Sequence, residues 1–341
     1  MTYLVAPETV EWEITYSCNL NCIHCNVVHN KLPNESDLNI LQLKRIADML
    51  ADANVFRISV GGGEPLLHPN SYELLGYLVK LGFTPLLLSN GIMLSEDVIR
   101  KLLDIGIKKI QISLDGANPE TYAKIRGRKN IYNLVINNAI RAAQEGLEIN
   151  ISTVLTKHNK DEIPEIIDIC LQIPANCYRV VSYVHTHSYG DNLQIDQRDL
   201  YSIAQYLVQK ERELKNRLQV YTPTPKFLHP EDSSAIIQRI APCKELMCEA
   251  GTILCTITPT GDLIPCTYFR DSEFIAGNLL DQSLYDIWHN SPILKSFRGM
   301  GEMSPECLSC SIHEMCHGGC RAMAYFETGD IRSLDPRCWL V

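Results

Sequence analysis

Several features that define common protein classes are missing from this sequence. No apolar stretch approaches the ~20 residues that a membrane-spanning helix requires. No basic run or basic helix face stands out and the formal net charge is −9, which argues against a nucleic-acid-binding surface. The N-terminus has no charged leader followed by an apolar region, so it is not a secretory signal. We therefore expect a cytoplasmic protein that acts on neither membranes nor nucleic acids.

Cysteine, by contrast, is abundant, with fourteen residues in a chain of 341. Thiols stay reduced in the cytoplasm, so clustered cysteines there indicate metal ligation rather than disulfides. Five cysteines lie before residue 243, and nine lie in residues 243–341. The chain exceeds the ~250–300 residues at which one hydrophobic core stops growing, which predicts two domains.

The first two thirds of the chain alternate between strand and helix patterns. Six such units imply a parallel sheet with right-handed crossovers. We predict an α/β fold of the partial (β/α)6 TIM-barrel type, whose functional residues lie on loops after the strands. The predicted strands are 9–15, 55–60, 84–89, 108–114, 147–155 and 177–184, and the predicted helices are 38–53, 71–82, 95–106, 131–145, 161–172 and 197–217.

Composition changes along the chain and suggests where the domains divide. Residues 1–218 are the predicted barrel, and the polar, proline-containing residues 219–242 are a predicted connection. Residues 243–341 hold short apolar runs, many turn residues and most of the cysteines. They are predicted to form a small second domain that bound metal holds together.

The loop after the first predicted strand reads YSCNLNCIHCNV, residues 16–27. Its spacing, Cys-x3-Cys-x2-Cys, is too irregular for a zinc ribbon, which uses paired Cys-x2-Cys elements. A [4Fe–4S] cluster takes four ligands, so three thiolates would leave one iron open to a small molecule. A structural zinc knuckle is the alternative for three cysteines taken alone.

This spacing resembles the signature of the radical S-adenosylmethionine (SAM) superfamily. The resemblance implies that Cys18, Cys22 and Cys25 bind a [4Fe–4S] cluster whose open iron is chelated by the amino and carboxylate groups of SAM. It implies reductive cleavage of SAM to a 5′-deoxyadenosyl radical, which abstracts hydrogen from a substrate. His24 occupies the position whose flat ring lies near the adenine in that family.

Motifs after the next three strands carry the same resemblance. GGEP (62–65) resembles the family motif whose backbone binds the amino group of SAM, while LSNG (88–91), ISLDG (112–116) and KIRGR (124–128) match regions that contact its ribose or carboxylate. Each motif alone could be a turn or a helix cap. The SAM-binding residues that the resemblance implies are His24, Gly62, Gly63, Glu64, Pro65, Ser89, Ser113 and Arg126.

The cysteines of residues 243–341 resemble those of the seven-cysteine SPASM domain, which follows many radical SAM barrels. With Cys243 they number eight proposed ligands, enough for two auxiliary [4Fe–4S] clusters and three clusters in the whole chain. Two structural zinc sites are the alternative. Cys243 lies outside the seven-cysteine pattern, and Cys255 is either a bystander or a neighbour of the first auxiliary cluster. The resemblance assigns Cys243, Cys248, Cys266 and Cys320 to the first auxiliary cluster, and Cys307, Cys310, Cys316 and Cys338 to the second.

Proteins with this architecture mostly modify peptides or proteins. The resemblance therefore implies a maturase that crosslinks, epimerises or oxidises a ribosomally made peptide, with an electron donor such as flavodoxin or ferredoxin. The short segment before Cys18 favours a separate leader-binding protein, and Thr267 replaces the aspartate of sulfatase-maturing relatives. The alternative enzyme is a tetrapyrrole or haem-pathway side-chain oxidase or decarboxylase. The alternative of another class is a non-catalytic iron–sulfur or zinc protein.

A polar segment after the sixth predicted strand could line the active site. Its candidate proton acceptors are Tyr183, His185 and His187, and an ordinary polar loop is the alternative.

Overall fold

A computed structural model describes residues 4–28, 36–186, 192–221, 248–299, 303–310, 312–338 and 340. Its centre is one ten-stranded sheet in the order β10-β9-β8-β1-β2-β3-β4-β5-β6-β7. Strands β1 to β7 are parallel and follow chain order, β8 joins the other side of β1 in parallel, and β9 and β10 are antiparallel. The strands are β1 (Thr9–Thr15), β2 (Arg57–Gly62), β3 (Leu86–Ser89), β4 (Lys109–Ser113), β5 (Glu148–Leu155), β6 (Cys177–Ser182), β7 (Gln219–Tyr221), β8 (Leu254–Ile257), β9 (Asp262–Ile264) and β10 (Gly277–Asn278).

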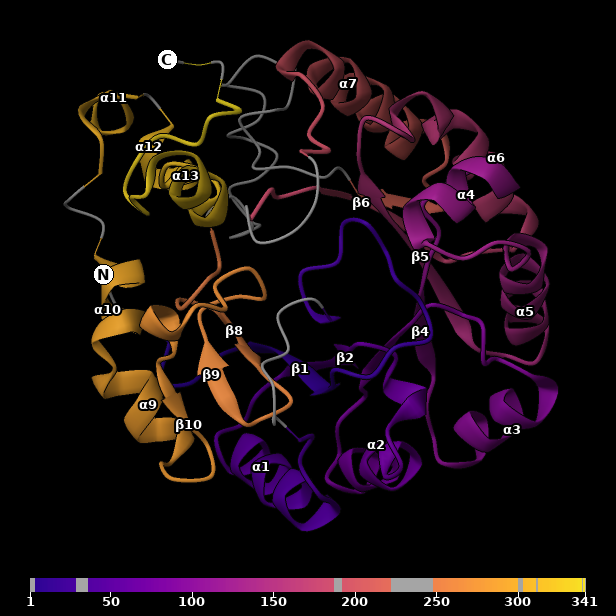
Figure 1. Cartoon of the computed structure of the whole chain (residues 1–341), viewed down its shortest axis with the longest axis horizontal. Helices are drawn as coiled ribbons and strands as arrows, with labels where there is room; N and C mark the ends of the chain where they lie inside the picture. The colour runs from indigo at the N-terminus through magenta and orange to yellow at the C-terminus, as the bar shows by residue number, and fades with distance from the viewer. Residues whose placement is uncertain are drawn as a thin grey trace.

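Helices cover the outer side of this curved sheet. In Figure 1 the helices α1 to α7 form an arc around the strands, and the C-terminal segment in orange and yellow lies at the open side of that arc. The helices are α1 (Ile40–Asp52), α2 (Ser71–Lys80), α3 (Glu96–Asp104), α4 (Pro119–Arg126), α5 (Tyr132–Gln144), α6 (Ile163–Gln172), α7 (Gln197–Glu213), α9 (Leu284–Asn290), α10 (Pro292–Arg298), α11 (Pro305–Leu308), α12 (His313–Cys316) and α13 (Arg321–Thr328). None of the helices described is long and apolar enough to cross a membrane.

Local sequence explains where the helices start and which side they bury. The α1 helix begins with a capping box, because the Asn39 side chain accepts from the amides of its first turn while Gln42 accepts from the Asn39 amide. Its buried residues recur at helical spacing, which turns one apolar stripe toward the sheet. The predicted cap of α3 is confirmed, since Ser95 Oγ accepts a hydrogen bond from the Val98 amide.

The two faces of the sheet differ in polarity, because successive side chains on a strand point to opposite sides. Trp12, Ile112 and Ile151 are fully buried in the apolar core between sheet and helices. The opposite, concave face carries polar residues at matching register, including Gln111 and Asn150. These residues are only half-buried, so the concave face is the accessible surface of the barrel.

The predicted partial barrel is confirmed, and its extent is larger than the sequence suggested. Residues 219–221, predicted to begin a connection, form β7 beside β6. The β8 strand belongs to the cysteine-rich segment yet pairs with β1. Both corrections have one cause. A strand of three or four residues leaves almost no periodic pattern, so only its pairing partner reveals it.

Candidate iron–sulfur and SAM site

The loop after β1 is held by the backbone of the GGEP motif. The Gly63 amide donates to the Thr15 carbonyl at 2.7 Å, and the Glu64 amide donates to the Ser17 carbonyl at 2.8 Å. A Cβ added to Gly63 would lie 2.2 Å from the Ser17 oxygen, so only glycine permits this approach. An ammonium group only donates hydrogen bonds, so the carbonyl oxygens of this turn are the backbone groups that can accept from it.

The other side of the same loop rests on the end of α4. The Ile23 amide donates to the Ile125 carbonyl at 2.9 Å. Gly127 ends the helix in the left-handed conformation, and a Cβ there would lie 2.2 Å from the Asn21 oxygen. The cysteine loop is therefore fixed from two sides by glycine contacts, and it lies inside the helical arc (Figure 1).

The three thiols of this loop are close enough to affect one another. Cys22 is buried, Cys18 and Cys25 are half-buried, and Cys25 interacts electrostatically with both others. Burial raises the pKa of Cys18 and raises that of Cys22 to about 11. Arg126 partly opposes this shift, because its Nη1 lies 3.6 Å from the Cys22 sulfur. Binding of a cluster would displace the thiol protons and use the thiolates as ligands.

Arg126 is buried beside this loop rather than exposed at the surface. Its Nη2 lies 2.7 Å from Asp115 Oδ2, and Asp115 Oδ1 accepts from the Val154 amide at 2.7 Å. The His24 Nε2 atom lies 3.6 Å from the same carboxylate. Burial lowers the pKa of His24 to about 4 despite the nearby Asp115, so the imidazole is neutral at physiological pH.

Glu64 and Ser89 meet behind the GGEP turn. The buried Glu64 carboxylate accepts from the Ser89 hydroxyl at 3.0 Å and from the Asn90 amide at 2.8 Å. Burial raises the pKa of Glu64, while these hydrogen bonds oppose the shift. Ser113 ends β4 on the concave face, in register with Ser152. The structure thus gathers most of the predicted SAM-binding residues around the cysteine loop, and the Ser89 hydroxyl donates to Glu64.

A second group of thiols lies within the C-terminal segment. Cys248, Cys266 and Cys320 interact electrostatically with one another, and burial raises the pKa of Cys266 and raises that of Cys320 to about 11. The Cys320 amide donates to Asp335 Oδ2 at 2.8 Å, and Asp335 in turn binds the buried Arg337 guanidinium. Cys243, the fourth proposed ligand, lies outside the described residues.

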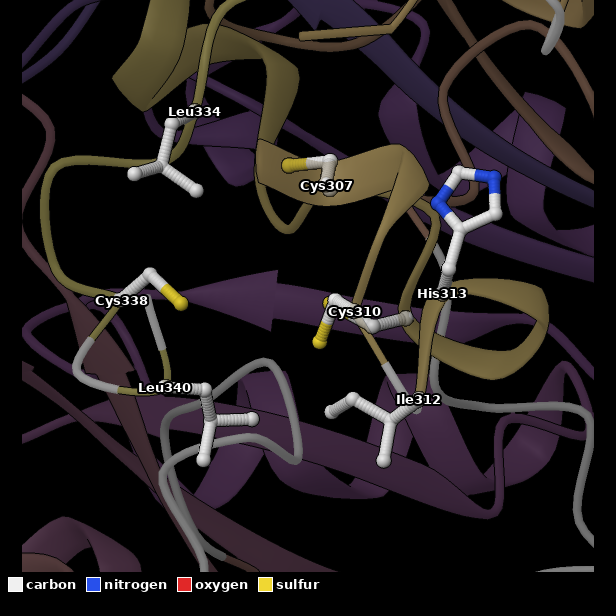
Figure 2. A pocket seen from close by; sticks show the side chains of 9 residues that line it. Cys307, Cys310, Ile312, His313, Leu334, Cys338 and Leu340 are labelled. Carbon is white, nitrogen blue, oxygen red and sulfur yellow. The ribbon is translucent and has the colours of Figure 1, made fainter. Parts of the chain in front are cut away.

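The third group lines a pocket in the C-terminal segment. Figure 2 shows the thiols of Cys307, Cys310 and Cys338 turned toward a common space. Cys316 also lines it, and burial raises the pKa of that thiol to about 12. These four residues are the ones that the resemblance assigned together. The remaining lining residues are Ile312, His313, Gly318, Leu334 and Leu340, none of which the sequence singles out.

The spacing of these thiols bears on the choice between clusters and zinc. A zinc ion binds all of its thiolates at about 2.3 Å, which brings them together. A [4Fe–4S] cluster spreads four thiolates over four irons, and a cavity between the thiols suits it. The residues present therefore fit iron–sulfur clusters.

The remaining cysteines lie away from these groups. Cys255 is in β8 opposite Val10, fully buried in the apolar core, which favours the bystander interpretation. Cys170 and Cys177 are buried, as predicted. Tyr183 Oη lies 3.2 Å from His185 Nδ1, so these two candidate acceptors are neighbours, whereas His187 is not among the described residues.

A parallel partial barrel with three thiols after its first strand, followed by two further thiol groups, defines an iron–sulfur protein with an open catalytic position. The profile of the radical SAM superfamily matches residues 12–170, and that of the SPASM iron–sulfur cluster-binding domain matches residues 248–311. The chain therefore contains a radical SAM domain followed by a SPASM domain. It is an enzyme whose cofactors are [4Fe–4S] clusters and SAM.

Relatives align over nearly the whole chain. The AdoMet-dependent heme synthase of Methanosarcina barkeri is 28% identical over 98% of this chain and 96% of its own length. The mycofactocin maturase MftC of Mycobacterium tuberculosis is 29% identical over 98% of this chain and 83% of its own length. Among solved structures, Streptococcus suis SuiB superposes with a TM-score of 0.83 at 22% identity, covering 99% of this chain and 78% of that one.

Proposed function

We propose that this chain is a peptide maturase that uses SAM to abstract hydrogen from a ribosomally made peptide. The observation that carries the proposal is the cysteine loop, in which three thiols lie between the GGEP turn and the end of α4. When bound, the reduced cluster and SAM would supply the hydrogen-abstracting chemistry. The protein's part is to position both reactants and to exclude competing reactions.

The residues around the loop suggest a division of labour. Cys18, Cys22 and Cys25 are the proposed ligands of the first cluster. We assign the SAM ammonium to carbonyl oxygens near Gly62 and Gly63, since an ammonium group donates hydrogen bonds and needs acceptors. The larger set of proposed SAM contacts is His24, Glu64, Pro65, Ser113 and Arg126.

Ser89 has a different proposed role from the one the sequence suggested. Its hydroxyl donates to both carboxylate oxygens of Glu64, at 3.0 and 3.1 Å. It would therefore act on SAM indirectly, by holding Glu64 and the GGEP turn in place.

The C-terminal segment is proposed to hold two auxiliary clusters. Cys248, Cys266 and Cys320, with Cys243, would bind the first, and the four cysteines around the cavity of Figure 2 would bind the second. We propose that the barrel domain extends through β7 to residue 221 and that residues 243–341 form the second domain, although β8 pairs with β1 across these limits. Such clusters could accept the electron that remains on the substrate after hydrogen abstraction.

Charge on the concave face favours a peptide over a tetrapyrrole. Strands β1 to β8 carry three cationic residues, and each has an acidic neighbour. A polycarboxylate tetrapyrrole would need free cations, whereas a peptide presents amides that suit polar neutral groups. The neutral polar residues on this face include Ser59, Gln111, Asn150 and Ser152, and the three charged pairs are Arg57–Glu8, Lys109–Glu148 and Arg179–Glu11.

The relatives allow both substrates. MftC is named a maturase. The PqqA peptide cyclase of Xanthomonas axonopodis is 28% identical over 99% of this chain, and its name describes action on a peptide. The heme synthase relative aligns over more of its own length, and for that reason a haem-pathway oxidase or decarboxylase is the second candidate.

A peptide maturase of this kind would need partners. We propose flavodoxin or ferredoxin as the electron donor, and a separate protein that binds the leader of the precursor. A reducing compartment such as the cytoplasm suits the chain, since no disulfide joins the cysteines of the described part.

The test has two stages. Reconstituted, reduced protein is incubated with SAM, and 5′-deoxyadenosine is measured, with the Cys22→Ala variant as the inactive control and Cys255→Ala as the matched active one. Absence of 5′-deoxyadenosine from the wild type would contradict the enzyme. A precursor peptide encoded beside the gene is then supplied, deuterated at its side chains, and its mass and the deuterium in 5′-deoxyadenosine are measured. Deuterium transfer from the peptide supports the maturase, and transfer only from a deuterated tetrapyrrole supports the second candidate.

A further inference from the structure

A buried ion pair joins the barrel to the loop after Cys266. Glu13, near the end of β1, is buried, and its Oε2 accepts from Arg270 Nη1 at 2.9 Å. Arg270 Nη2 binds the other carboxylate oxygen, so the pair is bidentate. Bidentate guanidinium–carboxylate pairs restrict orientation as well as distance, unlike a single hydrogen bond.

Thr267 completes this network at the position where sulfatase-maturing relatives carry an acid. Its hydroxyl donates to Glu13 Oε1 at 2.9 Å and accepts from Arg270 Nη2 at 2.8 Å. Its carbonyl accepts from Asn26 Nδ2 at 2.8 Å. The residue after Cys266 is therefore tied to the residue after Cys25, which joins the loops of two proposed cluster sites.

The location of the network gives it a specific role. The β1–β8 ladder fixes the two segments as far as Trp12 opposite Ile257. Glu13 is the next residue of β1, so the ion pair begins where the strand pairing stops. The first cluster loop follows the end of β1, whereas the loop of Cys266 follows β9, which runs antiparallel to β8. Glu13, Thr267 and Asn26 provide cross-links between these two loops.

We propose that Glu13, Arg270, Thr267 and Asn26 form a clamp that sets the separation and orientation of the SAM cluster relative to the first auxiliary cluster. They are positioning residues, since they act through the two cluster loops. The inference rests on the proposed function, because it takes both loops to be loaded with clusters. Small displacements of reacting groups lower rates strongly, so a fixed separation matters for electron transfer after hydrogen abstraction.

The test measures the distance between clusters directly. Fully loaded wild type, Glu13→Gln and Arg270→Lys are reduced, and the dipolar coupling between the SAM cluster and the first auxiliary cluster is measured by pulsed EPR. Glu13→Gln keeps the side-chain shape but removes the charge, and we expect a broader, shifted distance distribution. Arg270→Lys keeps the charge without the bidentate geometry. Its distance distribution is expected to lie between those of the wild type and Glu13→Gln. Glu8→Gln removes a carboxylate just before β1 whose partner Arg57 is exposed, and it should match the wild type.

The outcomes separate this inference from the proposed function. An unchanged distribution in fully loaded Glu13→Gln overturns the clamp, even if its melting temperature falls, because a purely stabilising ion pair would not move the clusters. If Glu13→Gln does not load, Thr267→Val removes only the hydroxyl and should give a smaller shift, and an unchanged distribution there overturns the clamp as well. Failure of the wild type to form 5′-deoxyadenosine would instead overturn the proposed function.

Discussion

Replacing Gly63 by alanine is expected to remove the SAM cluster while the two auxiliary clusters remain. Gly63 lies outside the left-handed region, so the cost comes from the added methyl group alone. That Cβ would lie 2.2 Å from the Ser17 oxygen, whereas real Cβ contacts essentially never fall below 3.0 Å. The Cys18 loop and the GGEP turn must therefore separate by about 0.8 Å or more.

A separation of this size affects the two hydrogen bonds that hold the loop. The Gly63–Thr15 and Glu64–Ser17 distances are 2.7 and 2.8 Å, so a separation of about 0.8 Å would stretch both bonds beyond the ~3.2 Å limit of good N–H···O geometry. Each bond contributes about 1 kcal/mol, and a buried donor left without a partner costs about 1–3 kcal/mol. The expected local destabilisation is roughly 2–4 kcal/mol, which at about 1.4 kcal/mol per factor of ten disfavours the native loop conformation by about 30- to 1,000-fold.

The assay combines iron and sulfide analysis with 5′-deoxyadenosine formation after anaerobic reconstitution. Iron should fall from about twelve to about eight atoms per chain, since each [4Fe–4S] cluster holds four. SAM cleavage should fall with the cluster, to the level of the Cys22→Ala variant. The control is Gly76→Ala in α2, where the nearest foreign atom would lie 3.9 Å from the new Cβ. Wild-type iron content and SAM cleavage in Gly63→Ala would refute the steric reasoning.

Three further predictions address other parts of the structure. Cys255→Ala should keep full iron content and SAM cleavage but lower the melting temperature, because the residue packs in the core. Loss of about four iron atoms per chain would instead identify Cys255 as a cluster ligand. Arg126→Leu leaves Asp115 buried without its cation and should destabilise the chain by about 3–5 kcal/mol. Arg126→Lys keeps a cation and should lower the melting temperature less. Equal losses in the two variants would argue against the ion pair. Burial raises the pKa of Glu11 above 4.5, so the folded chain binds the proton more tightly and its stability falls as the pH rises through the folded pKa. Glu11→Gln should remove that loss. Its melting temperature should therefore exceed that of the wild type at pH 7, whereas the two should not differ in this direction at pH 4.

Most of the barrel was predictable because its elements are long and regular. The six predicted strands correspond to β1 to β6, since apolar residues that face the helices alternate with polar residues that face the concave side. The α4 helix was missed because it is short and only two of its apolar side chains, Tyr122 and Ile125, are buried. Its Asn118 cap followed by Pro119 was the signal that could have revealed it.

The candidate site was predictable in part for a different reason. Cysteine spacing and strand-end motifs are local in sequence, so they identify the loop of Cys18, Cys22 and Cys25 without any knowledge of tertiary contacts. The grouping of cysteines far apart in sequence came from the resemblance, and the four cysteines that it assigned to the second auxiliary cluster line one pocket. The assignment of Cys243 and the role of His187 stay predictions, since neither lies in the described part of the chain.

The sequence alone determined which chemistry this chain can host, because thiol spacing and glycine positions are properties of short segments. Only the tertiary structure decided how those segments are held. Arg126 lies beside Cys22 rather than at the surface, Ser89 donates to Glu64, and Glu13 binds Arg270 across 257 residues of sequence. Such contacts depend on burial and on through-space distance, and a buried charge is stable only where the fold supplies its partner.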